Sequence, residues 1–169
     1  MVRIKYLIIA VLVVVFGVWG IWAAIHFVQS EEKKVKKQFH LLSEWASKET
    51  GENTFAMAQK IKNVGTLFAG HCELKADLIS FSGRYTPEEI SSYAARARFP
   101  FSNLSLKFYD FNVAFPEEGV AKVSLTAKLT GRSTTGEDMD ETHELECVLK
   151  KMEKKWLFSE LEVVEVLKK

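Results

Sequence analysis

Two histidine–cysteine pairs are the residues of this sequence whose types suit a metal ion. The first pair is His71 and Cys72, and the second is His143 and Cys147. In a β-strand each residue rises about 3.3 Å, so positions four apart are separated by about 13 Å, and adjacent residues point to opposite faces. Because His143 and Cys147 fall in a predicted strand, and His71 and Cys72 lie at the start of another, neither pair converges on one ion. We expect no metal site.

The two cysteines are predicted to be core thiols, because Cys72 and Cys147 fall on the apolar side of their strands. A disulfide between them, formed in an oxidising compartment, stays open as the alternative. The sequence has neither a Gly-rich phosphate loop nor a Gly-x-Ser-x-Gly nucleophile motif. We therefore assign no catalytic residue and expect no cofactor.

Asp110 is the acid with the most interesting position for proton transfer. It is in phase with Leu106 and Phe108, and a general base needs a carboxylate on such an apolar face. A change of phase near Tyr109 would instead turn Phe111 inward and leave Asp110 at a bulge. We favour this second interpretation.

The elements that position these residues begin with three amphipathic patterns. Apolar residues at helical spacing predict helices over residues 30–48 and 53–69. A third helix opens at Thr86, which can cap it. Pro87 fits its first turn, Glu89 completes a capping box, and the helix ends before Pro100. Between the second and third helices, alternating residues predict a strand over 72–81, with a change of phase near its end.

Strand patterns fill the rest of the chain. They predict four antiparallel strands, over residues 103–115, 120–130, 140–150 and 155–166, with a polar loop over 131–138. Helices segregated from a largely antiparallel sheet indicate an α+β fold.

The element order resembles the nuclear transport factor 2-like superfamily, the cone-shaped fold (SnoaL-like, cystatin-like) that is shared with ketosteroid isomerase. The final hairpin, residues 146–163, is similar to the last hairpin of that family, where a charged turn precedes a Trp, here Trp156. The resemblance covers residues 31–169 and implies helices packed on a curved sheet. The family hosts enzymes, binding modules and scaffolds, so the fold does not decide the function.

The cone implies a pocket between the helices and the sheet. His143, in phase with Leu145, is expected at its rim. The isomerase catalytic set does not map onto this sequence, which counts against an enzyme. The candidate pocket-lining residues are Trp45, Tyr93, Phe108, Asp110, His143 and Trp156.

A membrane anchor is predicted over residues 6–28, which contain no charged side chain and follow a short basic tail, residues 1–5. As a helix this run is about 34 Å long, enough for a hydrocarbon core of about 30 Å. Tyr6, Trp19 and Trp22 lie toward its ends, as interfacial aromatic residues do. The run is too long for a cleaved signal peptide and has no small-residue cleavage site at its exit.

The side of the membrane is less clear from the charges. Arg3 and Lys5 precede the run, but four lysines follow it between residues 33 and 37. We favour a cytoplasmic N-terminus in the cell (inner) membrane, with residues 30–169 as one soluble domain on the external or periplasmic side.

These features favour a single-pass, membrane-anchored interaction or ligand-binding domain that is not an enzyme. The formal net charge of +1 argues against nucleic acid as a partner. The expected partners are the bilayer, another protein or a second copy, and a small hydrophobic ligand. Among relatives of the fold, bitopic scaffold subunits of type IV secretion systems offer a model. The alternative is a small-molecule binder or an isomerase- or cyclase-like enzyme that uses the cone pocket.

Overall fold

The structure is a computed structural model that describes residues 26, 28–76 and 81–164. It divides into two units, Met1–Lys34 and Val35–Lys169. Nearly all of the predicted span, residues 6–25 and 27, lies outside the described residues. Within the part that is described, no helix is long and apolar enough to cross a membrane. In the first unit, Lys34 Nζ forms an ion pair with Glu31 Oε1 at 2.8 Å.

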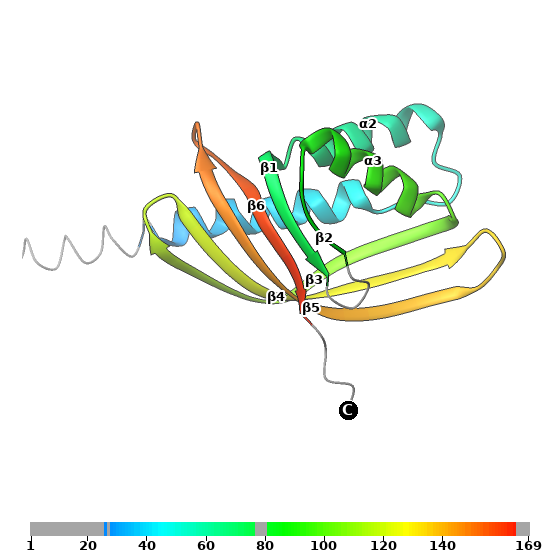
Figure 1. The fold of residues 1–169 in the computed structure, drawn as a ribbon. Helices are drawn as coiled ribbons and strands as arrows, with labels where there is room; N and C mark the ends of the chain where they lie inside the picture. The colour runs from blue at the N-terminus through cyan, green and yellow to red at the C-terminus, as the bar shows by residue number, and fades with distance from the viewer. Residues whose placement is uncertain (1–25, 27, 77–80, 165–169) are drawn as a thin grey trace, which may run out of the picture. The chain divides into compact units, whose positions relative to one another are not determined.

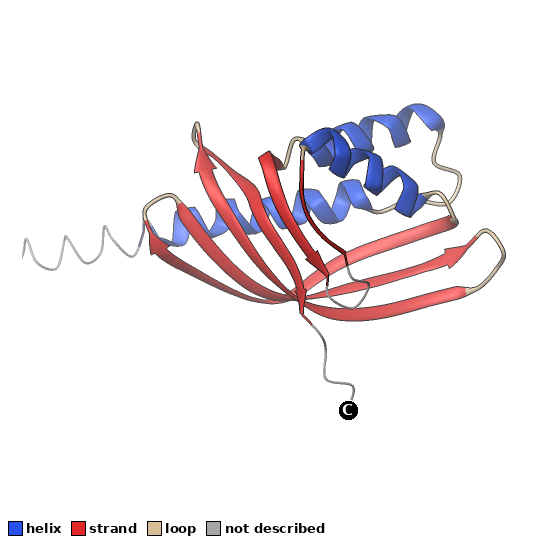
Figure 2. Ribbon diagram, viewed as in Figure 1, coloured by secondary structure: helices blue, strands red, loops and turns tan. Residues whose placement is uncertain are grey.

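The second unit is an α+β domain in which helices pack on a curved mixed sheet (Figures 1 and 2). The N-terminal helix comprises residues 28–46. The elements that follow are α2 (Thr54–Gly65), β1 (Phe68–Ala76), β2 (Phe81–Tyr85), α3 (Pro87–Arg98), β3 (Phe101–Glu117), β4 (Val120–Ser133), β5 (Asp138–Met152) and β6 (Lys155–Val164).

The sheet has the order β2-β1-β6-β5-β4-β3, and every neighbouring pair is antiparallel except β1 and β6. This corrects the predicted strand over residues 72–81, which is two antiparallel strands joined through residues 77–80, outside the described residues. The second helix also ends at Gly65 rather than near residue 69. Phe68 already pairs with Phe158 of β6, so its apolar side chain belongs to the sheet.

Residues 35–46 of the N-terminal helix lie against the inner face of the sheet, and Phe39 is the centre of that contact. Its ring meets the rings of Phe108, Phe111 and Phe158 edge-on, with centroids 5.4, 5.3 and 4.9 Å apart. Such edge-to-face contacts add to the free energy gained by burying the rings. They fix this helix across β3 and β6.

The helix α3 begins as the sequence predicts. The Thr86 backbone N–H donates to Glu89 Oε2 at 2.8 Å, and the Glu89 N–H donates to Thr86 Oγ1 at 3.3 Å. Helix α2 packs closely on it at Gly65. A Cβ at that position would lie 2.5 Å from Ser91 Oγ and 2.8 Å from the Pro87 carbonyl oxygen, so a side chain is excluded there.

A buried ion pair ties the end of α3 to the segment after the N-terminal helix. Arg98 is 2% exposed, and its Nη2 lies 2.5 Å from Glu52 Oε2 and donates to the Ser47 carbonyl at 3.0 Å. Lys60 of α2 lies 2.6 Å from the other carboxylate oxygen of Glu52. The pair joins three segments that are distant in the sequence, which favours one arrangement of the helices.

The alternation of residues gives the sheet an apolar inner face and a polar outer face. In β4, Ala121, Val123, Leu125 and Ala127 are buried in the core. The residues that alternate with them, such as Lys122 and Ser124, are exposed on the other face. In β3 the phase slips at Asp110, which has φ +54° and lies at a register shift between Tyr109 and Asn112. The predicted bulge is therefore present, and Phe108 and Phe111 both pack on Phe39.

Candidate functional site

The outer face of the sheet carries two polar rows that run across neighbouring strands. Paired residues of β4, β5, β6 and β1 form them. The first row is Lys122, Val148, Glu160 and Glu73, and the second is Ser124, Glu146, Glu162 and Lys75. Here "outer face" means the side of the sheet on which these residues lie.

Two pairs of carboxylates are directly opposed in these rows. Glu146 pairs with Glu162 across β5 and β6, and Glu160 pairs with Glu73 across β6 and β1. Like charges placed directly opposite each other destabilise a sheet. The two opposed pairs are therefore unfavourable contacts, which Lys75 offsets in part because it is ion-paired with Glu73 and lies opposite Glu162.

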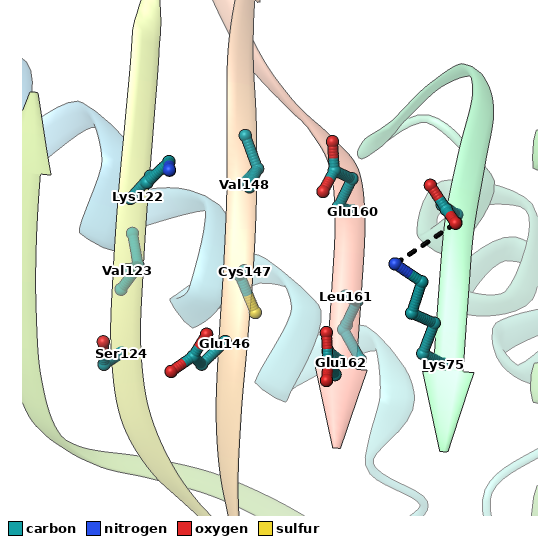
Figure 3. Close-up of a pocket in the computed structure, with 11 residues that line it drawn as sticks. Lys75, Lys122, Val123, Ser124, Glu146, Cys147, Val148, Glu160, Leu161 and Glu162 are labelled. Carbon is teal, nitrogen blue, oxygen red and sulfur yellow. Dashed lines mark ion pairs between the residues drawn. The ribbon is translucent and has the colours of Figure 1, made fainter. Parts of the chain in front are cut away.

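The same residues border a hollow of about 230 Å³. Figure 3 shows the carboxylates of Glu146, Glu160 and Glu162 on one side of the sheet, with Lys122 at the β4 side. At the β1 side, Lys75 Nζ lies 3.2 Å from Glu73 Oε1. Four carboxylates and two ammonium groups thus line the hollow, so its charge is negative.

The negative field of this face changes the pKa of neighbouring groups. Lys75 has a raised pKa, first because of its hydrogen bond and charge interaction with Glu73, and further because of Glu162 and Glu160. Burial raises the pKa of Cys72 to about 12, with help from Glu160 and Glu73. Burial also raises the pKa of Cys147, to which the neighbouring Cys72 and Glu146 contribute.

A second hollow, of about 220 Å³, shares Ser124 and Glu146 with the first. Asp110 and Glu144 line it, and Asp110 Oδ2 accepts a hydrogen bond from Thr126 Oγ1 at 3.3 Å. The bulge in β3 therefore turns Asp110 to the outer face, away from the side on which Phe108 meets Phe39. Asp110 extends the acidic surface toward the sheet edge.

The other candidate pocket residues are spread over the inner side. Trp45 is partly buried against the core, and Phe108 packs on Phe39. Trp156 is buried beside Phe115, with ring centroids 5.8 Å apart.

On α3, Tyr93 is 41% exposed and meets Tyr85 edge-on at 5.3 Å. None of Trp45, Tyr93 and Trp156 lines either outer hollow.

His143 lies in phase with the core residue Leu145, on the inner side of β5. Its Nε2 is 3.3 Å from Glu141 Oε2, and the two side chains are 33% and 58% exposed. Its Nδ1 is buried and has no hydrogen-bond partner among the described residues. The pair is a histidine–carboxylate arrangement that sequence analysis found only in part, because Glu141 was not singled out.

The cysteines and histidines do not form a metal centre in the described part of the chain. Cys72 and Cys147 are buried free thiols there. In residues 26, 28–76 and 81–164, no three His, Cys, Asp or Glu side chains are arranged to hold an ion. The carboxylates of the outer face are thus spread along β1, β3, β5 and β6 rather than gathered around one point.

Sequence reasoning missed Glu146, Glu160 and Glu162 as a group. The signal was present, since Glu146 alternates with core residues of β5 and the other two alternate with Leu161 in β6. This alternation indicates only that one face of each strand is exposed to solvent. Their direct opposition depends on the β5–β6 register and on the parallel pairing of β1 with β6, which local patterns do not reveal.

Comparison with known proteins identifies the fold. No protein-family model and no curated protein sequence matches the chain. Solved structures do match. A protein from Novosphingobium aromaticivorans, provisionally assigned as a scytalone dehydratase, has a TM-score of 0.69 at 15% identity and covers 82% of this chain and 86% of its own. The likeness is one of fold, helices packed on a curved mixed sheet, and it is consistent with the expected cone.

Two further structures show how varied the proteins with this cone are. A hexachlorocyclohexane dehydrochlorinase, LinA type 2, matches with a TM-score of 0.65 at 10% identity, over 80% of this chain and 85% of its own. A protein from Xanthomonas campestris, provisionally assigned as a calcium/calmodulin-dependent protein kinase II association domain, matches with a TM-score of 0.58 at 13% identity, over 79% and 84%. At these identities the likeness concerns the fold alone.

Proposed function

We propose that this domain binds a Lys- or Arg-bearing segment of another protein on the outer face of its sheet, while residues 6–28 hold the chain in a membrane. The observation that carries the proposal is the pair of opposed carboxylates, Glu146 with Glu162 and Glu160 with Glu73. Arrangements that lower the stability of the free protein are commonly kept where function needs them. A cationic side chain placed between the carboxylates would turn repulsion into attraction.

The size and charge of the hollow fit this partner. A volume of about 230 Å³ holds the end of one or two long side chains but not a drug-sized ligand. Its two lysines lie at opposite borders, on β4 and β1, and Lys75 is ion-paired with Glu73 and lies opposite Glu162. Four carboxylates against two ammonium groups still leave the hollow with a negative charge. Complementary charges of this kind chiefly set the association rate and the choice of partner.

The charge also distinguishes between partners. If two copies met through the same face, carboxylates would oppose carboxylates, and such juxtaposition opposes association. A different protein with a basic surface is therefore the better occupant of this face. The structure likeness to an association domain is compatible with an interaction role.

A photo-cross-linking amino acid at Val148, which lies between Lys122 and Glu160 in the first row, tests this proposal in cells that express the full chain. The expected product is a discrete heteromeric adduct. The same reagent at Glu137, in the hairpin between β4 and β5, is the matched control and should not give that adduct. A product of twice the chain mass, or no product specific to Val148, would contradict the proposal.

Membrane anchoring rests on the uncharged run over residues 6–28 and is tested separately. The full chain should stay in the membrane fraction after alkaline carbonate extraction, and a chain that lacks residues 1–28 should not. A reporter that works only outside the cytoplasm should be active when it is fused after Lys169. A reporter that works only in the cytoplasm should be inactive at the same position. Release of the full chain by carbonate would contradict anchoring, and activity of a cytoplasmic reporter would contradict the external location.

A second candidate function is proton transfer on a small molecule, as in an isomerase or a lyase. The observation that favours it is the His143–Glu141 pair, because a histidine beside a carboxylate is a common general base. The dehydrochlorinase and the dehydratase assignment among the structural neighbours fit this candidate. A panel of small hydrophobic ligands should raise the melting temperature of the wild-type chain but not of His143→Gln. Equal shifts in both proteins would remove this pair from ligand binding.

A further inference from the structure

A groove on a different part of the domain lies between the N-terminal helix and the edge strand β3. The helix contributes Lys36, His40 and Ser43, whose spacing of four and three residues puts them on one helix face. The strand contributes Lys107, Phe108, Tyr109 and Phe111. The groove has a volume of about 240 Å³. Because β3 is at the end of the sheet order, the groove opens at the sheet edge.

The chemistry of the groove is cationic and aromatic. Lys36 Nζ lies 5.7 Å from the centre of the Phe111 ring, a cation–π contact that positions the ammonium group over the aromatic wall. His40 adds an exposed imidazole one helical turn further on. None of the described residues that line this groove is acidic. The lining thus carries the ammonium groups of Lys36 and Lys107, in contrast to the acidic outer face of the sheet.

The walls of the groove are held in place by contacts on both sides. Ser43 Oγ donates a hydrogen bond to the Leu106 carbonyl at 2.5 Å, which fixes the helix to β3. From the core side, Phe39 packs on Phe108 and Phe111. A site whose walls are fixed before binding loses less conformational freedom when a ligand enters.

We propose that this groove binds the phosphate of an anionic phospholipid headgroup, an inference that rests on the membrane anchoring proposed above. Lys36 follows the uncharged run closely along the chain, and lysines just beyond a span attract anionic lipid. The volume suits a phosphate with its glycerol, while the acyl chains stay in the bilayer. The aromatic wall contacts the apolar part of the glycerol backbone.

The test uses the full chain in neutral maltoside micelles and isothermal titration calorimetry. The separate probes are dihexanoyl-phosphatidylglycerol, dihexanoyl-phosphatidylcholine and inorganic phosphate. Phosphatidylglycerol should bind saturably, and the other two should bind at least about tenfold more weakly. Lys36→Gln should weaken phosphatidylglycerol binding about fivefold, the effect of one lysine near an anionic surface. His40→Gln should weaken it as well.

The matched control is Lys37→Gln, which removes the same charge from the next position of the same helix but does not line the groove. Unchanged binding by this variant is expected. Equal loss in Lys36→Gln and Lys37→Gln would overturn the groove as the site, and equal affinity for inorganic phosphate would overturn the lipid as the ligand. Carbonate extraction reports on anchoring independently, so failure of the headgroup site and failure of the anchor are distinguishable.

Discussion

Glu146 and Glu162 are directly paired across the antiparallel strands β5 and β6, and both carboxylates lie on the outer face of the sheet. The next row repeats the arrangement with Glu160 and Glu73. A single acidic residue on the solvent-exposed face of a strand is ordinary and needs no explanation. Two opposed pairs in adjacent rows give a surface whose charge is unbalanced in the free protein.

Replacing Glu146 with Lys should make the domain more stable and less able to bind. The new ammonium group would face Glu162, so the cross-strand interaction changes from repulsive to attractive, and the free energy of unfolding should rise by about 0.5–1 kcal/mol. Urea unfolding of the full chain measures the change. Glu137→Lys, in the β4–β5 hairpin, makes the same change of charge away from the rows and should leave the stability nearly the same. A less stable Glu146→Lys protein would show that the pair is not repulsive.

Removing Arg98 should destabilise the domain strongly. Arg98→Met leaves the buried Glu52 carboxylate with Lys60 as its remaining partner, so the loss should approach but not exceed the cost of about 3–5 kcal/mol for breaking a buried pair on one side. The double variant Arg98→Met/Glu52→Gln removes both charges and should recover part of this loss. If the single variant costs less than about 1 kcal/mol in chemical unfolding, the pair does not hold α3 to the segment before α2.

The close approach of α2 and α3 predicts the effect of a single methyl group. Gly65→Ala would put a Cβ 2.8 Å from the Pro87 carbonyl oxygen, which belongs to the backbone and cannot rotate away. Overpacking of this kind costs about 1–3 kcal/mol. Gly70→Ala is the control, since an added Cβ there meets nothing within 4 Å. Equal melting temperatures for the two variants would mean that the helices separate without cost.

The buried thiols predict how stability changes at alkaline pH. Burial raises the pKa of Cys72 to about 12 in the folded domain, from 9.0 for a thiol exposed to water. Above pH 9 the unfolded chain therefore loses a proton that the folded domain keeps, so this contribution to stability is complete below pH 9 and is lost as the pH rises toward 12. The free energy of unfolding should fall less steeply between these values in Cys72→Ala than in the wild type. Identical slopes would show that the thiol is not desolvated.

Much of the fold could be predicted because its local signals agree. The capping box of Thr86 and Glu89 and the alternation of β4 from Ala121 to Ala127 place α3 and the central strand. The pattern of apolar residues in β3 also predicts the change of phase at Asp110. The apolar spacing around Phe68 continues the stripe of α2 and so predicts a helix there. Only the pairing of Phe68 with Phe158 of β6 shows that this stretch belongs to the sheet.

The candidate site was harder to predict than the fold, for a physical reason. Each carboxylate of the rows looks like an ordinary solvated residue within its own strand. The site forms because β1, β6 and β5 are adjacent in the sheet. This order brings Glu73, Glu160 and Glu146 to one surface. That order includes a parallel pairing of strands distant in the sequence, which no local pattern encodes.

The most direct test of the outer face as a binding surface is the yield of the Val148 cross-link in a Glu162→Lys background. The charge change removes one carboxylate from the hollow and adds a cation at its centre, next to Lys75. The heteromeric adduct should fall at least about tenfold, and it should also fall in the wild type as salt is raised. An adduct of unchanged yield in Glu162→Lys would contradict the proposal that a basic partner binds these carboxylates.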